Sequence, residues 1–173
     1  MTWSSTLARF RTRLGLVVGA AAFWLARPTL DTVAVGAMIA ALGEALRIWA
    51  AGHLHKSREV TSSGPYRWLG HPLYVGSSIM GVGLAVASAS VAVTLLIVIY
   101  LGATIAAAVK TEEAFLSQQF GHEYDRYRAG SRAPVARRFS LARVFANGEH
   151  RTIAGVVAVV LLLALKATYN VLF

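Results

Sequence analysis

The sequence predicts an all-α integral membrane protein with about five transmembrane helices. Three observations lead to this fold class. Hydrophobic residues make up 56% of the 173 residues, and the mean hydropathy is +0.56. Charged residues make up only 14%, against about 25% in typical soluble proteins. The charges also cluster between long apolar stretches, which indicates hydrophobic spans separated by polar loops.

The first apolar stretch covers residues 14–26 and ends at Arg27-Pro28. It is short for a span of roughly 20 residues, unless its flanking arginines extend toward the headgroups. Arg9, Arg11 and Arg13 precede it, as basic residues precede the apolar part of a signal peptide. No small-residue cleavage site followed by a soluble body appears, so we expect a retained first span.

The second stretch covers residues 30–51 and contains Glu44 and Arg47. Residues three apart share one face of a helix, so these two side chains are expected to pair near the end of the span. We favour a structural ion pair, with a functional site inside the membrane as the alternative.

Residues 72–109 contain no charged residue and are too many for one span but about right for two. Ser88-Ala89-Ser90 is expected to form the tight turn between them, which predicts a helical hairpin. A last span is expected at residues 153–173.

The positive charges predict the orientation of these spans. The N-terminal tail has three Lys or Arg residues, segment 47–67 has four and segment 110–151 has eight, whereas the opposite connections have only Arg27. We therefore expect the N-terminus and both long polar segments in the cytoplasm, the C-terminus outside, and a bacterial-type inner membrane. The net charge of +9 then reflects membrane orientation and anionic lipid, with no nucleic-acid partner expected.

Several kinds of site are not expected. The chain has no cysteine, which excludes disulfides, thiolate ligands and thiol nucleophiles. His53 and His55 are two residues apart and have no suitably spaced third ligand, so no metal site is predicted. No glycine-rich loop follows a strand pattern, which excludes a Rossmann-type cofactor site.

The first chemically suggestive segment is residues 61–76. Gly64-Pro65 predicts a turn, and Pro72 can occupy the first position of a helix, which places His71 at its N-cap. Free backbone N–H groups at such a helix start favour a carboxylate or phosphate. His71 has aromatic residues on both sides in the sequence: Tyr66, Trp68 and Tyr74. An alternative interpretation is that these three side chains only anchor the protein at the membrane interface.

The second segment begins at Lys110 and contains the adjacent acids Glu112 and Glu113. Paired carboxylates there could bind an ammonium group or lie near a sulfonium, with salt bridges to the basic loop as the alternative. Beyond them, one apolar and aromatic stripe, interrupted by Gly121, is expected: Leu116, Phe120, Tyr124 and Tyr127. This stripe fits either a surface helix on the bilayer or the lid of a cofactor pocket.

These two motifs resemble a known family. Gly64-Pro-Tyr-Arg-Trp…His71-Pro-Leu-Tyr-Val-Gly76, followed by Glu112-Glu113-x-Phe-Leu-x-x-x-Phe-Gly-x-Glu-Tyr-x-x-Tyr127, is similar to the isoprenylcysteine carboxyl methyltransferases. That family is similar in turn to the phospholipid N-methyltransferases. The segment from Arg47 to Lys56 fits bacterial members. The match covers about residues 45–130, and it implies one membrane methyltransferase-like domain over residues 1–173.

The resemblance implies that S-adenosylmethionine binds in a cytoplasmic pocket at the ends of the hairpin spans. The implied cofactor-binding residues are His71, Leu73, Tyr74, Gly81, Gly83, Glu112, Glu113, Tyr124, Tyr127 and Arg128. The implied catalytic residues are His71, Arg67 and Glu113. One departure concerns the substrate, because the family usually has Arg before His-Pro and this chain has Gly70. Arg67 could reach the same region.

The predicted function is therefore S-adenosylmethionine-dependent methyl transfer to an amphipathic, membrane-embedded substrate. The acceptor is a lipid or isoprenoid-linked carboxylate or amine that enters sideways from the bilayer. An amine would need a base, for which His71 or a glutamate is the candidate. Two alternatives remain at this point: an NADPH-dependent enzyme similar to the membrane sterol reductases, and a non-enzymatic membrane scaffold. No oligomeric state is predicted.

Overall fold

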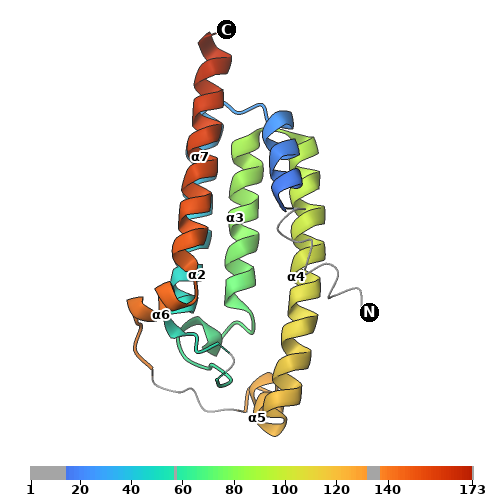
Figure 1. Cartoon of the computed structure of the whole chain (residues 1–173), viewed down its shortest axis with the longest axis vertical. Coiled ribbons are helices and arrows are strands. Elements are labelled where there is room, and N and C mark those ends of the chain that lie inside the picture. The colour runs from blue at the N-terminus through green and yellow to red at the C-terminus, as the bar shows by residue number, and fades with distance from the viewer. Residues whose placement is uncertain (1–14, 57, 132–136, 173) are drawn as a thin grey trace.

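A computed structural model describes residues 15–56, 58–131 and 137–172 of the chain. Within these ranges the structure is helical and contains no strand, which confirms the all-α prediction. A helix at Gly15–Leu25 comes first. It is followed by α2 (Leu30–His53), the 3-10 turn η1 (Gly64–Arg67), α3 (Pro72–Ser88), α4 (Val91–Phe120), α5 (His122–Arg128), α6 (Leu141–Ala146) and α7 (Glu149–Leu172), as Figure 1 shows.

Among the described residues, three helices are long and apolar enough to cross a membrane: α2, α4 and α7. All five apolar stretches expected from the sequence are helical, but α3 has 17 residues and the described part of the first helix is Gly15–Leu25. At about 1.5 Å per residue, α3 is about 25 Å long, slightly less than a hydrocarbon core of about 30 Å. The structure therefore supports three spans by length, and the count of five stays a prediction.

The helix starts follow from local capping chemistry. The Thr29 side chain accepts a hydrogen bond from the backbone N–H of Thr32, and the Thr32 hydroxyl oxygen accepts one from the N–H of Thr29, which forms a capping box at the start of α2. Between α3 and α4, Ala89 adopts a left-handed conformation with φ 46°, and the Ser90 side chain caps α4. The predicted hairpin turn at residues 88–90 is confirmed.

The sequence placed the end of the fourth apolar helix near residue 109, whereas α4 continues to Phe120. Residues 110–120 are good helix formers without proline or glycine, so the helix extends past its apolar part. Gly121 then ends the helix with φ 43°. The expected interruption of the stripe from Leu116 to Tyr127 at Gly121 is confirmed, and this glycine divides the stripe between α4 and α5.

Helices α2 and α3 pack at unusually short range through glycines. A Cβ atom built on Gly36 would lie 2.4 Å from the carbonyl oxygen of Gly83, and one on Gly43 would lie 2.6 Å from that of Gly76. No side chain fits between backbones this close, so glycine is required on both helices. This contact fixes α3, and therefore its first turn, relative to α2.

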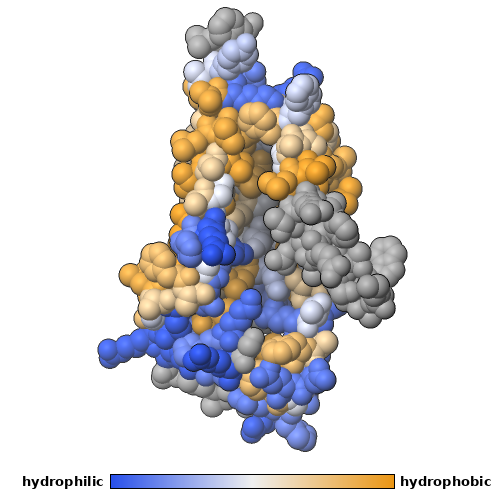
Figure 2. Space-filling view, in the orientation of Figure 1, coloured by the Kyte–Doolittle hydropathy of each residue, from blue (hydrophilic) through white to orange (hydrophobic). Residues whose placement is uncertain are grey.

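The polar segments gather at one end of the helices. Figure 1 shows the ends of α2 and α4, the starts of α3 and α7, and α5 and α6 at the lower end, with the C-terminus at the opposite end. Figure 2 shows a hydrophobic surface over the upper helices and a hydrophilic surface at the lower end. Exposed apolar side chains such as Val98 (62%), Ile99 (68%) and Leu165 (69%) suit contact with lipid. The N-terminal arginines used in the orientation argument lie outside the described residues.

Candidate functional site

The centre of the candidate site is a cluster of one histidine and two glutamates, which we call the His–Glu cluster: His71, Glu112 and Glu113. Nε2 of His71 lies 3.4 Å from Oε1 of Glu113, and Nδ1 lies 3.9 Å from Oε2 of Glu112. The three side chains keep 23%, 40% and 36% of their surface exposed, respectively. The two motifs singled out in the sequence therefore meet in space, and a small polar ligand could reach them.

Local structure explains why the motifs meet. His71 is the N-cap of α3, with Pro72 in the first turn, but its side chain makes no capping hydrogen bond. The imidazole is therefore available to turn toward α4. The glutamates reach it because α4 continues beyond its apolar part, and because the short turn at residues 88–90 makes α3 and α4 antiparallel neighbours.

Tyrosines from three elements surround the cluster. The ring of Tyr74 on α3 lies 5.7 Å from the His71 ring, and the rings of Tyr124 and Tyr127 on α5 stack at 6.3 Å. The Tyr127 hydroxyl donates a hydrogen bond to the carbonyl oxygen of Tyr66 at 3.0 Å and lies 3.4 Å from that of Leu69. Helix α5 is thus tied to the segment that precedes His71.

Two of these phenols are held in their protonated form. Burial, and after it the negative charge of Glu112, raises the pKa of Tyr66. Burial, and after it the charge of Glu113, raises the pKa of Tyr124. Both phenols therefore keep their protons, and can donate hydrogen bonds, to a higher pH than an ordinary tyrosine does.

Three further predicted residues lie around the cluster rather than in it. Leu73 follows Pro72 in the first turn of α3, and its carbonyl oxygen accepts a hydrogen bond from Arg47. Arg67 is exposed, with its guanidinium 5.4 Å from the centre of the Trp68 ring, and Arg128 is exposed at the end of α5. A Cβ atom on Gly70 would meet nothing within 4 Å, so packing does not exclude the arginine that the family usually has there.

The two glycines of the expected Gly-x-Gly element face different helices. A Cβ atom on Gly81 would lie 2.3 Å from the Leu101 side chain of α4, whereas one on Gly83 would lie 2.5 Å from the backbone nitrogen of Ala40 on α2. Both are buried, and Gly81 is about 13 Å along the helix from the first turn of α3. The structure brings neither into the His–Glu cluster, and it places Gly83 in the α2–α3 contact.

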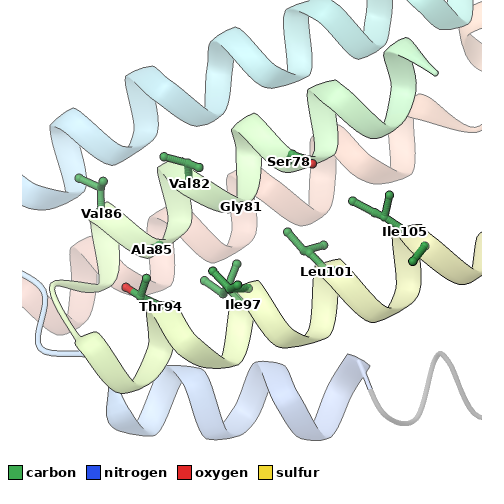
Figure 3. Close-up of a pocket in the computed structure, with 12 residues that line it drawn as sticks. Ser78, Gly81, Val82, Ala85, Val86, Thr94, Ile97, Leu101 and Ile105 are labelled. Atoms are coloured by element: carbon green, nitrogen blue, oxygen red, sulfur yellow. The ribbon is translucent and has the colours of Figure 1, made fainter. Parts of the chain in front are cut away.

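A cavity of about 630 Å³ lies between α3 and α4. Figure 3 shows Ile97 and Leu101 of α4 pointing toward α3, where Ser78, Gly81 and Ala85 also line the cavity. Its two hydroxyl-bearing side chains bond within their own helices, because Ser78 donates to the Tyr74 carbonyl oxygen and Thr94 to that of Ser90. The cavity is therefore apolar, and Ser78 lies one helical turn from Tyr74.

Sequence reasoning missed Glu149, which is the main partner of Arg47. Nη2 of Arg47 lies 2.8 and 2.9 Å from the two carboxylate oxygens of Glu149, and Nε lies 3.1 Å from Oε2. The expected partner Glu44 lies farther away, at 3.7 Å. The last helix was expected to begin at residue 153, which assigned Glu149 to a polar loop, whereas α7 begins at Glu149 itself.

Other polar contacts at this end are structural. Arg143 donates a hydrogen bond to the carbonyl oxygen of Gly52, and Asn147 donates one to that of Ala51. These bonds give hydrogen-bond partners to carbonyl oxygens in the last turn of α2. Arg137 pairs with Glu59, and this hydrogen bond raises the pKa of Arg137. In the part of the chain that the structure describes, no group of three or more His, Asp or Glu side chains is arranged to hold a metal ion.

Three helices of membrane-spanning length and a His–Glu cluster at one end define the class as a helical membrane protein with a polar site at the ends of its helices. A family model described as phospholipid methyltransferase matches residues 14–123, and the chain belongs to this family. It is the family that also holds the isoprenylcysteine carboxyl methyltransferase-like proteins, which confirms the resemblance of the two motifs.

Two curated proteins are similar to the chain. The nickel-cobalt-cadmium resistance protein NccN of Alcaligenes xylosoxydans xylosoxydans is 29% identical over 106 residues, which are 60% of this chain and 48% of that protein. The cobalt-zinc-cadmium resistance protein CzcN of Cupriavidus metallidurans is 30% identical over 99 residues, which are 56% of this chain and 44% of that protein. The chain thus spans about half the length of the curated relatives it matches. No solved structure matches it.

Proposed function

We propose that the protein is an S-adenosylmethionine-dependent methyltransferase that acts on an amphipathic substrate held in the membrane. The proposal rests on membership of the phospholipid methyltransferase family together with one observation. His71 lies within 4 Å of Glu112 and of Glu113, although the motifs are about 40 residues apart in the sequence. The proposal treats residues 1–173 as one domain, with 45–130 as its core.

The chemistry of the cluster fits this cofactor, which carries an ammonium group, a carboxylate and a sulfonium. Glu112 and Glu113 are partly exposed carboxylates that can accept hydrogen bonds from an ammonium group. The first turn of α3 offers the backbone N–H of Leu73 for a carboxylate, since Pro72 has no N–H and those of Tyr74 and Val75 donate to the His71 carbonyl oxygen. The Tyr74 ring beside His71 offers an aromatic face for a sulfonium. When bound, the cofactor would supply a methyl group on a positively charged sulfur.

The residues of the chain then have three tasks. They orient the acceptor in line with the methyl group, which is the main requirement for transfer from a good leaving group. They exclude water, for which α5 is suited because Tyr127 fastens it to the segment before His71. For an amine acceptor they also remove a proton, and His71 is the candidate base, with Glu113 placed to stabilise the resulting imidazolium. A carboxylate acceptor needs no base.

The cavity between α3 and α4 supports an apolar tail on the substrate. It begins one turn beyond Tyr74 and runs along apolar side chains of both helices. Its volume of about 630 Å³ is large enough for part of an acyl or isoprenoid chain. A headgroup at the His–Glu cluster and a tail in this cavity would give a substrate that enters from the bilayer.

We further propose that the polar end of the helices faces the cytoplasm of a bacterial-type inner membrane and that the C-terminus lies outside. The support is the excess of Lys and Arg in the two polar segments, which lie at the same end of the structure. A cytosolic cofactor would then reach the cluster directly.

Ligand binding tests this function. Purified protein in detergent is titrated with S-adenosylmethionine, with its demethylated product and with NADPH. We expect binding of the first two alone, and methyl transfer into a lipid class when a lipid extract is supplied. Binding of NADPH alone would favour a reductase, and binding of none would favour a scaffold.

Variants test the site. His71→Ala and Glu113→Ala are expected to weaken cofactor binding by roughly 10- to 100-fold, because each removes a hydrogen bond to a charged group. Membrane insertion should not change. The matched control is His122→Ala, since His122 is an exposed histidine at the start of α5. Unchanged affinity in both site variants would refute the assignment.

A further inference from the structure

The family match ends at residue 123, yet the last helix reaches back to the candidate site. We infer that Glu149 of α7 and Arg47 of α2 form a positioning pair that orders the first turn of α3. Through that turn the pair positions His71, so the part of the inference that concerns the cofactor rests on the proposed function. Neither residue touches the ligand, and both act through α3.

Glu149 and Arg47 are joined through both carboxylate oxygens of Glu149. Glu149 is only 4% exposed, and its two carboxylate oxygens receive Arg47 hydrogen bonds of 2.8, 2.9 and 3.1 Å. The Thr152 hydroxyl lies 3.5 Å from Nη2 of Arg47. This two-oxygen geometry fixes the plane of the guanidinium as well as its position.

Arg47 also contacts α3. Nη1 of Arg47, the terminal nitrogen not bonded to Glu149, donates to the Leu73 carbonyl oxygen at 3.3 Å and to the Ser77 hydroxyl. The Ser77 hydroxyl in turn donates to the same carbonyl oxygen at 3.0 Å. Leu73 is two residues from His71. One side chain therefore connects α7 to the turn that carries the histidine of the cluster.

Glu44 explains why Arg47 needs Glu149 to keep this position. Glu44 is 7% exposed and lies 3.7 Å from Nε of Arg47, one turn earlier on α2. Neither of its carboxylate oxygens has a hydrogen-bond partner among the described residues. Without the carboxylate of Glu149, the guanidinium, whose side chain is 15% exposed, would turn to Glu44, because a largely desolvated charge requires a partner. That rotation would remove its hydrogen bond to Leu73.

The test compares Glu149→Gln with Lys166→Gln. Lys166 provides the matched control because it also ties α7 to another helix, through hydrogen bonds to the carbonyl oxygens of Phe23 and Trp24, but at the opposite end. The first readout is amide hydrogen exchange of residues 74–77 in detergent, which needs no ligand. We expect roughly tenfold faster exchange in Glu149→Gln and no change in Lys166→Gln.

The second readout is the dissociation constant of S-adenosylmethionine, expected to rise roughly tenfold in Glu149→Gln alone. A charge swap, Arg47→Glu with Glu149→Arg, separates positioning from simple helix docking. It restores an ion pair between α2 and α7 but not the hydrogen bond to Leu73. The protein should therefore insert into the membrane, while amide exchange of residues 74–77 stays fast. If the doubly substituted protein does not insert, Ser77→Ala replaces it in the test. This variant removes one hydrogen bond of Arg47 to α3 and keeps the pair of Arg47 with Glu149.

The two proposals fail in different ways. If the wild-type protein binds no S-adenosylmethionine, the proposed function fails, and hydrogen exchange alone decides the positioning pair. If exchange at residues 74–77 is the same in Glu149→Gln and the wild type, or if the swap restores slow exchange, the positioning pair is wrong.

Discussion

Gly83→Ala tests the close contact between α2 and α3. The added Cβ atom would lie 2.5 Å from the backbone nitrogen of Ala40, 2.6 Å from the carbonyl oxygen of Gly36 and 2.9 Å from the Cα atom of Ala40. All three neighbours belong to the α2 backbone, so no side-chain rotation can relieve the overlap. Ordinary van der Waals contact begins near 3.4 Å, and the helices would have to separate by nearly 1 Å.

The expected cost follows from this overlap. Overpacking a well-packed contact costs about 1–3 kcal/mol, and alanine recovers up to about 1 kcal/mol of helix propensity over glycine. Because the Cβ atom would overlap backbone atoms alone, the upper part of the overpacking range applies, and we expect a net loss of about 1–2 kcal/mol. For a chain of this length that corresponds to a fall of roughly 2–8 °C in Tm.

The assay is thermal unfolding in detergent, with Gly155→Ala as the matched control. Gly155 lies within α7, and a Cβ atom there would meet nothing within 4 Å. The control should keep or slightly raise its Tm. A Gly83→Ala protein as stable as the wild type would refute the packing argument and return Gly83 to consideration as a cofactor residue.

Three further predictions concern the site. Ala85→Phe fills the cavity between α3 and α4, so the KM for a lipid acceptor should rise several-fold while cofactor affinity is unchanged; equal effects on both would contradict separate subsites. Gly70→Arg should fold normally because its Cβ position is open, and comparing labelled products from carboxylate and amine lipids would show whether this position selects the acceptor. Burial raises the pKa of Tyr66, so the folded state holds a proton that the unfolded state releases above its ordinary pKa of about 10. Stability should therefore fall as pH rises beyond about 10, and Tyr66→Phe should reduce that slope in denaturation measurements.

Much of the fold is determined locally and was therefore predictable. The apolar runs, the uncharged hairpin and its turn at residues 88–90 each depend on neighbouring residues. The end of α4 was misplaced because the sequence argument followed hydrophobicity, whereas residues 110–120 stay helical on intrinsic propensity until Gly121. The same extension divides the expected stripe of Leu116 to Tyr127 between two helices.

The candidate site was partly predictable for a related reason. His71 and the two glutamates lie in compact motifs, and a hairpin necessarily brings its two open ends together. Glu149 gave no comparable signal, because its pairing with Arg47 joins residues 102 positions apart and depends on how α7 packs. Gly81 and Gly83 show the same limit, since two nearby residues of one motif face different neighbouring helices.

The sequence by itself determined helical secondary structure, apolar segments of spanning length and the presence of two motifs, because periodicity, capping and transfer free energy act within one segment. Only the tertiary structure decided that His71 contacts Glu113, that an apolar cavity lies between α3 and α4 one turn beyond Tyr74, and that α7 reaches the site through Arg47. These contacts depend on the relative placement of helices, which small residues and buried polar pairs set jointly across the chain.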